Sequence, residues 1–312
     1  MENFNHFVSS RGLLRSCDFH SSSPQSSSSR LDINFLEGLG SSDSIYLCTD
    51  ALVDFAINYL PKISTPFILV SGDSDLCVDD SILKNELLAI VDSPLLIAWY
   101  AQNLCASHPK LFPIPIGNDY HTMWEKPGLW GLSKISPLAQ ERFLIEILKD
   151  SPDFSRRYAM AYCNWHLAMQ RGDRQECFAK VDKKSCFYEP NKIPRMASWR
   201  RQSEFMFVLS PEGIGIDCHR TWEALMLGSI PIVKKKLPSS LFDGLPVIQV
   251  DDWSEINQNR LMDIAHSVMS KKFNFSPLFL NYWSKKIHGS IAEPLEEMTL
   301  DEFKKFMTFS GC

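Results

Sequence analysis

The chain has 312 residues, enough for one large domain or two ordinary ones, and a formal net charge of −5. This acidic balance argues against a nucleic-acid-binding protein, because such proteins carry a basic excess or a basic stripe. Hydrophobic residues make up 45% of the chain and charged residues 22%, which is typical of a protein with a packed core.

Neither a secretory signal segment nor a membrane span is evident. The first residues, MENFNHFVSSRGLLRS, contain no continuous apolar run. The most apolar stretch, 87–101, is interrupted by Asp92-Ser93-Pro94 and is shorter than the ~20 residues that a bilayer requires. The nine cysteines are scattered, odd in number and include no C-x-x-C pair, so we expect free thiols and no zinc site. These features favour a cytoplasmic protein without a membrane anchor.

Residues 1–30 predict a disordered, serine-rich tail, since HSSSPQSSSSR at 20–30 has almost nothing to bury. An N-terminal α/β domain follows over residues 31–150, and its short runs are apolar throughout, as in parallel strands covered on both faces. The predicted strands lie at 44–49, 66–71, 95–100 and 112–116, and the predicted helices lie at 50–60, 82–91 and 137–149. The prolines of the 112–116 strand place it at an edge of the sheet or make it an irregular strand.

A second α/β set occupies residues 151–290. Its predicted strands lie at 157–163, 204–209, 230–233 and 247–250, and its predicted helices lie at 175–181, 218–227 and 254–270. Residues 291–312 predict a C-terminal helix that could pack back on the N-terminal domain. The predicted fold class is therefore α/β, with two Rossmann-like, doubly wound domains whose strands end at a central cleft, the natural ligand site of this architecture.

The most informative segment is residues 207–233, FVLSPEGIGIDCHRTWEALMLGSIPIV, which predicts a strand, a glycine loop, a helix, a tight turn and a strand. Gly213 and Gly215 allow the loop backbone to approach a ligand closely. Asp217 is a candidate N-cap of the helix. The first turn of the helix offers free N–H groups and the positive end of its dipole, which favours a bound pyrophosphate.

Three polar side chains of this helix extend the hypothesis to a nucleotide. His219 and Arg220 lie in the first turn, where an arginine can hold phosphate oxygens through two N–H groups. Glu223 lies ~9 Å along the axis on the face of Arg220, a suitable distance for ribose hydroxyls. A dinucleotide-binding G-x-G-x-x-G loop would need glycine where Cys218 stands, so the spacing argues against it. The alternative that loop and helix are only scaffold stays open.

At these residues the chain resembles a known enzyme family. SPEGIGIDCHRTWEALMLGSIPIV resembles the signature of exostosin-like glycosyltransferases (family 47), in which a glycine loop precedes an Arg-x-x-Glu-Ala-Leu helix and a Gly-x-x-Pro turn. The segment LPVIQVDDW at 245–253 resembles the next element of that family. In the N-terminal half, PIPIGNDYHTMW at 113–124 and VSGDSD at 70–75 are similar to a soluble subgroup described as xylosyltransferases.

The resemblance implies a GT-B fold, a UDP-sugar donor in the C-terminal domain, inversion at the anomeric carbon and no required metal or other cofactor. It implies that Arg220 binds the diphosphate and that Glu223 binds the ribose. Arginines at 156, 157, 171 and 174 are candidates for a second diphosphate contact. The predicted donor-binding residues are Ser210, Pro211, Gly213, Gly215, His219, Arg220, Glu223 and Arg157.

Inverting transfer requires a base that takes the proton of the acceptor hydroxyl. Four candidates follow N-terminal strands at their carboxyl ends, namely Asp73, Asp75, Asp119 and His121, and position makes Asp73 the first choice. Any one of them could instead form a turn or cap a helix. Asp73-Ser74-Asp75 also matches the D-x-D pattern that holds Mn²⁺ in some glycosyltransferases, but such a metal would lie in the half opposite Arg220, so no metal site is predicted.

The expected function is transfer of a sugar, with xylose as first choice, from a UDP-sugar to a hydroxyl of a glycan or glycoprotein. The alternative is a catalytically silent protein that binds a nucleotide sugar or a carbohydrate with the same fold. A nicotinamide-dependent oxidoreductase is disfavoured by Cys218. The acceptor, the linkage and the oligomeric state stay open.

Overall fold

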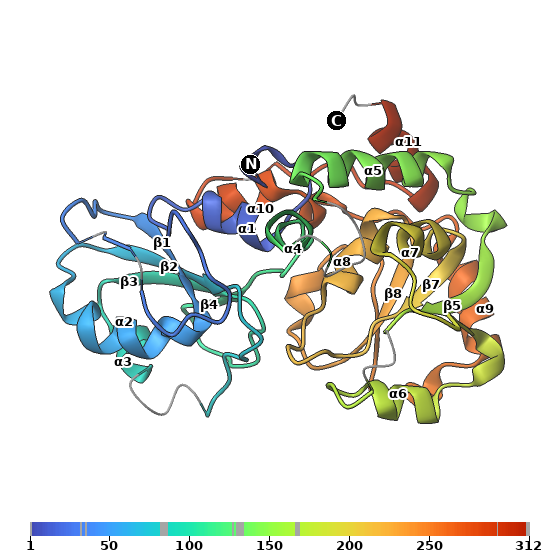
Figure 1. The fold of residues 1–312 in the computed structure, drawn as a ribbon, viewed down its shortest axis with the longest axis horizontal. Helices are drawn as coiled ribbons and strands as arrows, with labels where there is room; N and C mark the ends of the chain where they lie inside the picture. The colour runs from blue at the N-terminus through green and yellow to red at the C-terminus, as the bar shows by residue number, and fades with distance from the viewer. Residues whose placement is uncertain are drawn as a thin grey trace.

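The computed structural model describes residues 2–31, 33–34, 36–81, 87–126, 128, 134–165, 169–291 and 293–309. Within these residues the chain forms two parallel β-sheets, of four and five strands, with helices around them (Figure 1). The predicted α/β class is confirmed, and the arrangement is compatible with two Rossmann-like domains. Residues 82–86 of one predicted helix, and residues 310–312 of the C-terminal segment, lie outside the described residues.

The N-terminal sheet is wound in one direction. It consists of β1 (Asp43–Cys48), β2 (Phe67–Gly72), β3 (Leu96–Ala101) and β4 (Leu111–Pro113), all parallel and in that order. Right-handed crossovers that all step the same way put their helices on one face, here α2 (Leu52–Asn58) and α3 (Leu88–Asp92). The other face packs against α1 (Ser10–Arg15) and α10 (Leu280–Ile287). This sheet therefore departs from the predicted doubly wound order, while the edge position of the proline-containing strand is confirmed.

The C-terminal sheet does reverse its winding. It consists of β5 (Tyr158–Cys163), β6 (Cys186–Tyr188), β7 (Phe205–Leu209), β8 (Ile230–Lys234) and β9 (Ile248–Val250), in the order β6-β5-β7-β8-β9. The chain steps outward from β5 to β6 and then crosses back to β7, so the strand order reverses between β5 and β7. Ligands of open α/β sheets bind at such a reversal, beyond the carboxyl ends of the strands.

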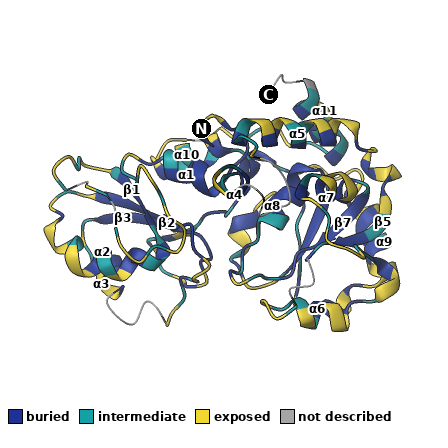
Figure 2. Cartoon of the chain, viewed as in Figure 1, coloured by how far each residue is buried: buried dark blue, intermediate teal, exposed yellow. Residues whose placement is uncertain are grey.

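Helices α6 (Arg174–Lys180), α7 (Arg195–Gln202), α8 (His219–Met226) and α9 (Gln258–Val268) surround this second sheet. Buried residues follow the strands of both sheets and α8, whereas exposed residues lie on the outer sides of α2, α3 and α6 (Figure 2). None of the helices in the described part of the chain combines the length and apolarity that a bilayer crossing requires.

The predicted disordered tail is wrong for residues 2–19. The segment preceding the serine-rich stretch contributes core residues, because Phe7 and Leu13 are fully buried and Ser9 caps α1. Its backbone is held in place by a carboxylate, since Glu141 accepts hydrogen bonds from the N–H groups of residues 6 and 7 at 2.8 and 3.0 Å. The serine content of 20–30 carried no information about the apolar residues that come before it.

The predicted domain boundary after residue 150 also differs from the packing. It assigns α5 (Pro137–Asp150) to the N-terminal domain, but Leu144 of this helix packs with Trp199 and Leu227 of the C-terminal half. The C-terminal helix α11 (Leu300–Phe309) lies along α5 (Figure 1). The two helices therefore pack together against the C-terminal half, where α5 contacts α7 and α8.

Glu2 predicts a distinctive pH dependence of stability. Burial raises the pKa of this carboxyl to about 8 from 4.5, although it accepts a hydrogen bond from Ser9 Oγ at 2.6 Å. Between these two values the folded chain keeps a proton that the unfolded chain releases, so stability falls as the pH rises. We expect Glu2→Gln to raise the thermal midpoint at pH 8 relative to the parent protein, and the difference to close towards pH 4.5. The exposed Glu146→Gln serves as control. A difference that does not change with pH would contradict the prediction.

Candidate active site

Loops from the carboxyl ends of both sheets meet directly. Asp75, after β2, accepts a hydrogen bond from the Gly215 N–H at 3.3 Å. The Asn103 side-chain oxygen, after β3, accepts one from the Asp217 N–H at 2.8 Å. Because these contacts join the N-terminal loops to the glycine loop, they define one site between the two sheets.

A cavity of about 150 Å³ opens at this junction. It is lined by Asp73, Asp75, Asp119, His121 and His219, together with Ser10, Ser26, Ser27, Ser74, Ile116 and Thr122. All four candidate bases thus reach one cavity, and His219 reaches it from the first turn of α8. His219 Nδ1 lies 2.7 Å from the Gly117 carbonyl oxygen, which fixes the ring against the N-terminal half.

Asp119 and His121 form a pair. His121 begins α4 (His121–Glu125), and its Nδ1 lies 3.2 Å from Asp119 Oδ1. The Asp119 carboxylate is held in this position, because it also accepts a hydrogen bond from the Thr122 N–H at 3.0 Å. The His121 side chain is 13% exposed and lines the cavity. A carboxylate can orient such an imidazole and stabilise it once it is protonated.

The electrostatics of this pair suit a base. Burial works against an ionised Asp119, but His121, His219 and Arg195 outweigh burial and hold the pKa of this carboxyl well below its usual range. Burial lowers the pKa of His121, and the neighbouring Asp119 and Asp73 carboxylates oppose this only in part. At neutral pH the pair is therefore a carboxylate beside a neutral imidazole, which can accept a proton.

Asp73, the first choice from sequence, is engaged by other side chains. Arg11 Nη2 lies 3.1 Å from its Oδ2, and both side chains are only 5% exposed. Ser26 Oγ donates a hydrogen bond to its Oδ1 at 2.8 Å, and the Asp73 N–H donates to Gln102 at 2.9 Å. The residue has a φ of +55°, in the left-handed region. Both carboxylate oxygens of Asp73 therefore have partners within the protein. This geometry disfavours Asp73 as the base, and that role stays a prediction.

Two guanidinium groups flank the glycine loop. Arg220 Nη1 donates hydrogen bonds to the Pro211 carbonyl at 3.1 Å and to Ser210 Oγ at 3.4 Å. Arg174 also contacts this loop, because its Nε donates a hydrogen bond to the Glu212 carbonyl at 3.3 Å. Burial, followed by the nearby Arg220 charge, lowers the pKa of Arg174 to about 10. Two guanidinium charges held beside the same loop are the chemistry of an anion site.

The structure contradicts the prediction for Arg157. This residue precedes β5 and lies at the amino edge of the sheet, opposite the glycine loop. Its guanidinium donates hydrogen bonds to the Leu227 carbonyl at 2.9 Å, the Pro152 carbonyl at 3.2 Å and Ser151 Oγ at 3.1 Å. These contacts hold the end of α5 to the end of α8. Among the four arginines considered from sequence, Arg174 lies beside Arg220, and Arg171 lies near Arg174 on the same carboxyl side of the sheet.

Glu223 is paired within the protein. Its Oε1 accepts hydrogen bonds from Arg195, one of them from Nε at 3.1 Å, and both side chains are buried. Burial works against an ionised Glu223, but the Arg195 charge outweighs it and holds the pKa low. Arg195 Nη1 also donates to the Asp119 carbonyl at 2.6 Å. Sequence reasoning missed Arg195, which connects α8 with the Asp119–His121 pair, and the role of Glu223 at a ribose stays a prediction.

The predicted N-cap of α8 is wrong. Cys218 occupies the N-cap position, while the Asp217 carboxylate accepts hydrogen bonds from the Ile116 N–H at 2.8 Å and from Trp222 Nε1 at 2.9 Å. Burial raises the pKa of Asp217 to about 6. The Asp217 carboxylate therefore connects the N-terminal segment at Ile116 with α8. Ser210 also has a partner within the protein, because its Oγ lies 2.8 Å from Thr221 Oγ1.

Within the described residues, no group of three or more His, Cys, Asp or Glu side chains has the arrangement of a metal site. No protein-family model matches the chain. No curated protein is significantly similar to it either.

Proposed function

We propose that the protein is an inverting glycosyltransferase of the GT-B type, which binds a UDP-sugar at the glycine loop and transfers the sugar to a hydroxyl of a glycan. The observation that carries the proposal is the cavity at the junction of the loops from the two sheets. It brings the Asp119–His121 pair to the amino end of α8, whose loop is flanked by Arg220 and Arg174. The exostosin-like signature around these residues supports the same assignment.

The roles follow from the chemistry of inversion. His121 takes the proton from the acceptor hydroxyl as that oxygen attacks C1 of the donor sugar, and Asp119 stabilises the imidazolium that forms. The bond from C1 to the diphosphate breaks in the same step, so negative charge grows on the leaving UDP. Arg220, Arg174 and the N–H groups at the start of α8 are the groups that stabilise this charge.

The finer assignments follow from the resemblance. Xylose is the proposed sugar, because the similar soluble subgroup is described as xylosyltransferases. The buried free thiols, which include Cys17, Cys163, Cys177 and Cys186, suit a reducing compartment such as the cytoplasm.

The proposed function is tested by presenting donors to the whole chain. UDP-xylose, UDP-glucose, GDP-mannose and TDP-glucose are compared by thermal unfolding, since a ligand that binds only the folded state raises its midpoint. The cognate UDP-sugar should stabilise the protein and be slowly hydrolysed to free UDP. Binding without any UDP release, with or without glycan acceptors, would favour the silent binding protein. No stabilisation by any of these nucleotides would overturn the proposal.

Arg220→Ala should weaken the binding of UDP by about 10- to 150-fold. This range corresponds to the ~1.5–3 kcal/mol of a hydrogen bond to a charged group. Isothermal titration with UDP measures it. The matched control is Arg260→Ala, an exposed arginine of α9. Equal UDP affinity in the two variants would contradict the assignment of the diphosphate to this loop.

A further inference from the structure

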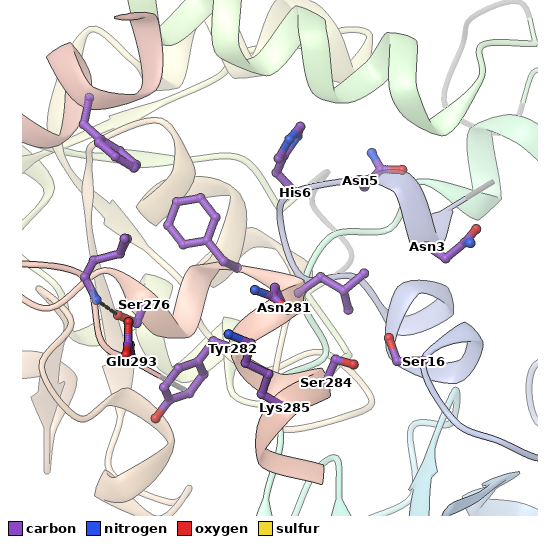
Figure 3. Close-up of a pocket in the computed structure, with 14 residues that line it drawn as sticks. Asn3, Asn5, His6, Ser16, Ser276, Asn281, Tyr282, Ser284, Lys285 and Glu293 are labelled. Carbon is purple, nitrogen blue, oxygen red and sulfur yellow. Dashed lines mark hydrogen bonds between the residues drawn. The ribbon is translucent and has the colours of Figure 1, made fainter. Parts of the chain in front are cut away.

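A second and larger cavity, of about 440 Å³, lies away from the catalytic cavity. It is formed where the N-terminal segment passes α10 and the chain that leads into α11 (Figure 3). Its volume falls within the range of ~300–1,000 Å³ that is usual for small-ligand sites. None of its lining residues belongs to the proposed donor or base groups.

The lining combines aromatic rings with neutral amides. Partly exposed rings of Phe279, Tyr282 and Phe306 border the cavity. In Figure 3, Asn5 on the N-terminal segment lies across from Asn281 and Tyr282 on α10. A sugar ring has an apolar C–H face and hydroxyl groups around its edge. Aromatic rings offer a surface for the face, and amide groups both donate to and accept from the hydroxyls.

Asn5 supplies an independent indication of a polar ligand. The residue is 5% exposed, and its Nδ2 donates to the Pro137 carbonyl at 3.1 Å. Its Oδ1, although buried, accepts no hydrogen bond from the described residues. A buried acceptor without a partner costs free energy, and a donating hydroxyl would recover it once the Asn5 side chain rotates to bring this covered oxygen to the cavity.

The charges favour a neutral ligand. Lys285 and Glu293 line the cavity with opposite signs, the His6 ring is paired with Glu141 at 3.2 Å, and no arginine is among the lining residues. This contrasts with the glycine loop, where two guanidinium groups lie together. An anionic ligand would lack the paired donors that carboxylates and phosphates prefer.

We propose that this cavity binds a neutral oligosaccharide, with one sugar ring on Tyr282 and hydroxyl groups bonded to Asn281 and Asn5. Helix α1 connects it to the catalytic cavity, because Ser10 lines one and Ser16, its C-cap, lines the other. Six residues of α-helix span ~9 Å. The site would therefore hold a distal part of the acceptor glycan, and this use, unlike the binding itself, rests on the proposed function.

The test measures binding to the whole chain without any nucleotide, so it does not depend on transfer. Xylohexaose, cellohexaose and maltohexaose are titrated by isothermal calorimetry, with a heparin hexasaccharide as the anionic comparison. At least one neutral hexasaccharide should bind, and Tyr282→Ala should weaken it by about tenfold. Tyr158→Ala, at a ring that is 60% exposed on β5, is the matched control. Asn281→Ala, an exposed change that should leave the thermal midpoint unaltered, should also weaken binding.

The outcomes separate this inference from the proposed function. Binding of a hexasaccharide without any transfer activity supports the inference by itself, whereas transfer without such binding leaves the proposed function standing. If none of the neutral hexasaccharides binds at about 10 mM, or if Tyr282→Ala and Asn281→Ala both bind like the parent, the inference is overturned. Tighter binding of the heparin hexasaccharide would likewise overturn the choice of a neutral ligand.

Discussion

Replacing His121 by asparagine should lower the rate of transfer by about 10²–10⁴-fold and leave UDP affinity almost unchanged. The reason is that the imidazole lines the cavity beside the Asp119 carboxylate, on the N-terminal side, while the diphosphate contacts come from the other sheet. Asparagine keeps a polar group of similar reach but cannot take a proton at neutral pH. Steady-state kinetics with the cognate donor and UDP titration measure the two quantities.

His266→Asn, at an exposed position on α9, is the control and should retain full activity. The pH profile gives a second readout: because burial lowers the pKa of His121, kcat/KM should stay high through neutral pH and fall only in acid, where the imidazole gains its proton. Retained transfer in His121→Asn, together with its loss in Asp75→Asn, would move the role of base to Asp75.

Asp73→Asn should destabilise the folded protein by about 3–5 kcal/mol, because it leaves the Arg11 charge buried without its partner. Asparagine can still accept the hydrogen bond from Ser26 Oγ, so the expected loss comes mainly from the ion pair. Denaturant unfolding measures the free energy. Transfer activity of the variant, measured well below its unfolding transition, tests separately whether the carboxylate is also a base.

A double-mutant cycle makes this prediction specific to the pair. Arg11→Met should also be destabilising, and Arg11→Met/Asp73→Asn should lose less than the sum of the two single variants, since neither charge is then left alone. Asp75→Asn, at an exposed carboxylate, is the matched control and should cost much less. A loss below about 1 kcal/mol in Asp73→Asn would show that this ion pair does not stabilise the fold.

Periodicity identified the longer elements. β7 is apolar along its whole length and β2 is apolar from Phe67 to Val70, and every residue of both strands is buried. Some short elements were missed, such as β6 with three residues and α10 with eight, because so few residues give only a weak strand or helix period. The predicted tail failed for a related reason, because a serine-rich composition over 20–30 was extended to residues that bury Phe7 and Leu13.

In the candidate site, too, some features follow from the local sequence and others depend on the folded chain. Local patterns were sufficient for the α/β class, for the glycine loop followed by α8, and for four side chains that follow strand ends, because each depends on neighbours within a few residues. The partners of those side chains required the folded chain. Arg11 reaches Asp73 from a segment expected to be disordered, and Arg195 reaches Glu223 from 28 residues away. Their ion pairs form only because packing brings separate elements together, a relation that spacing along the chain does not encode.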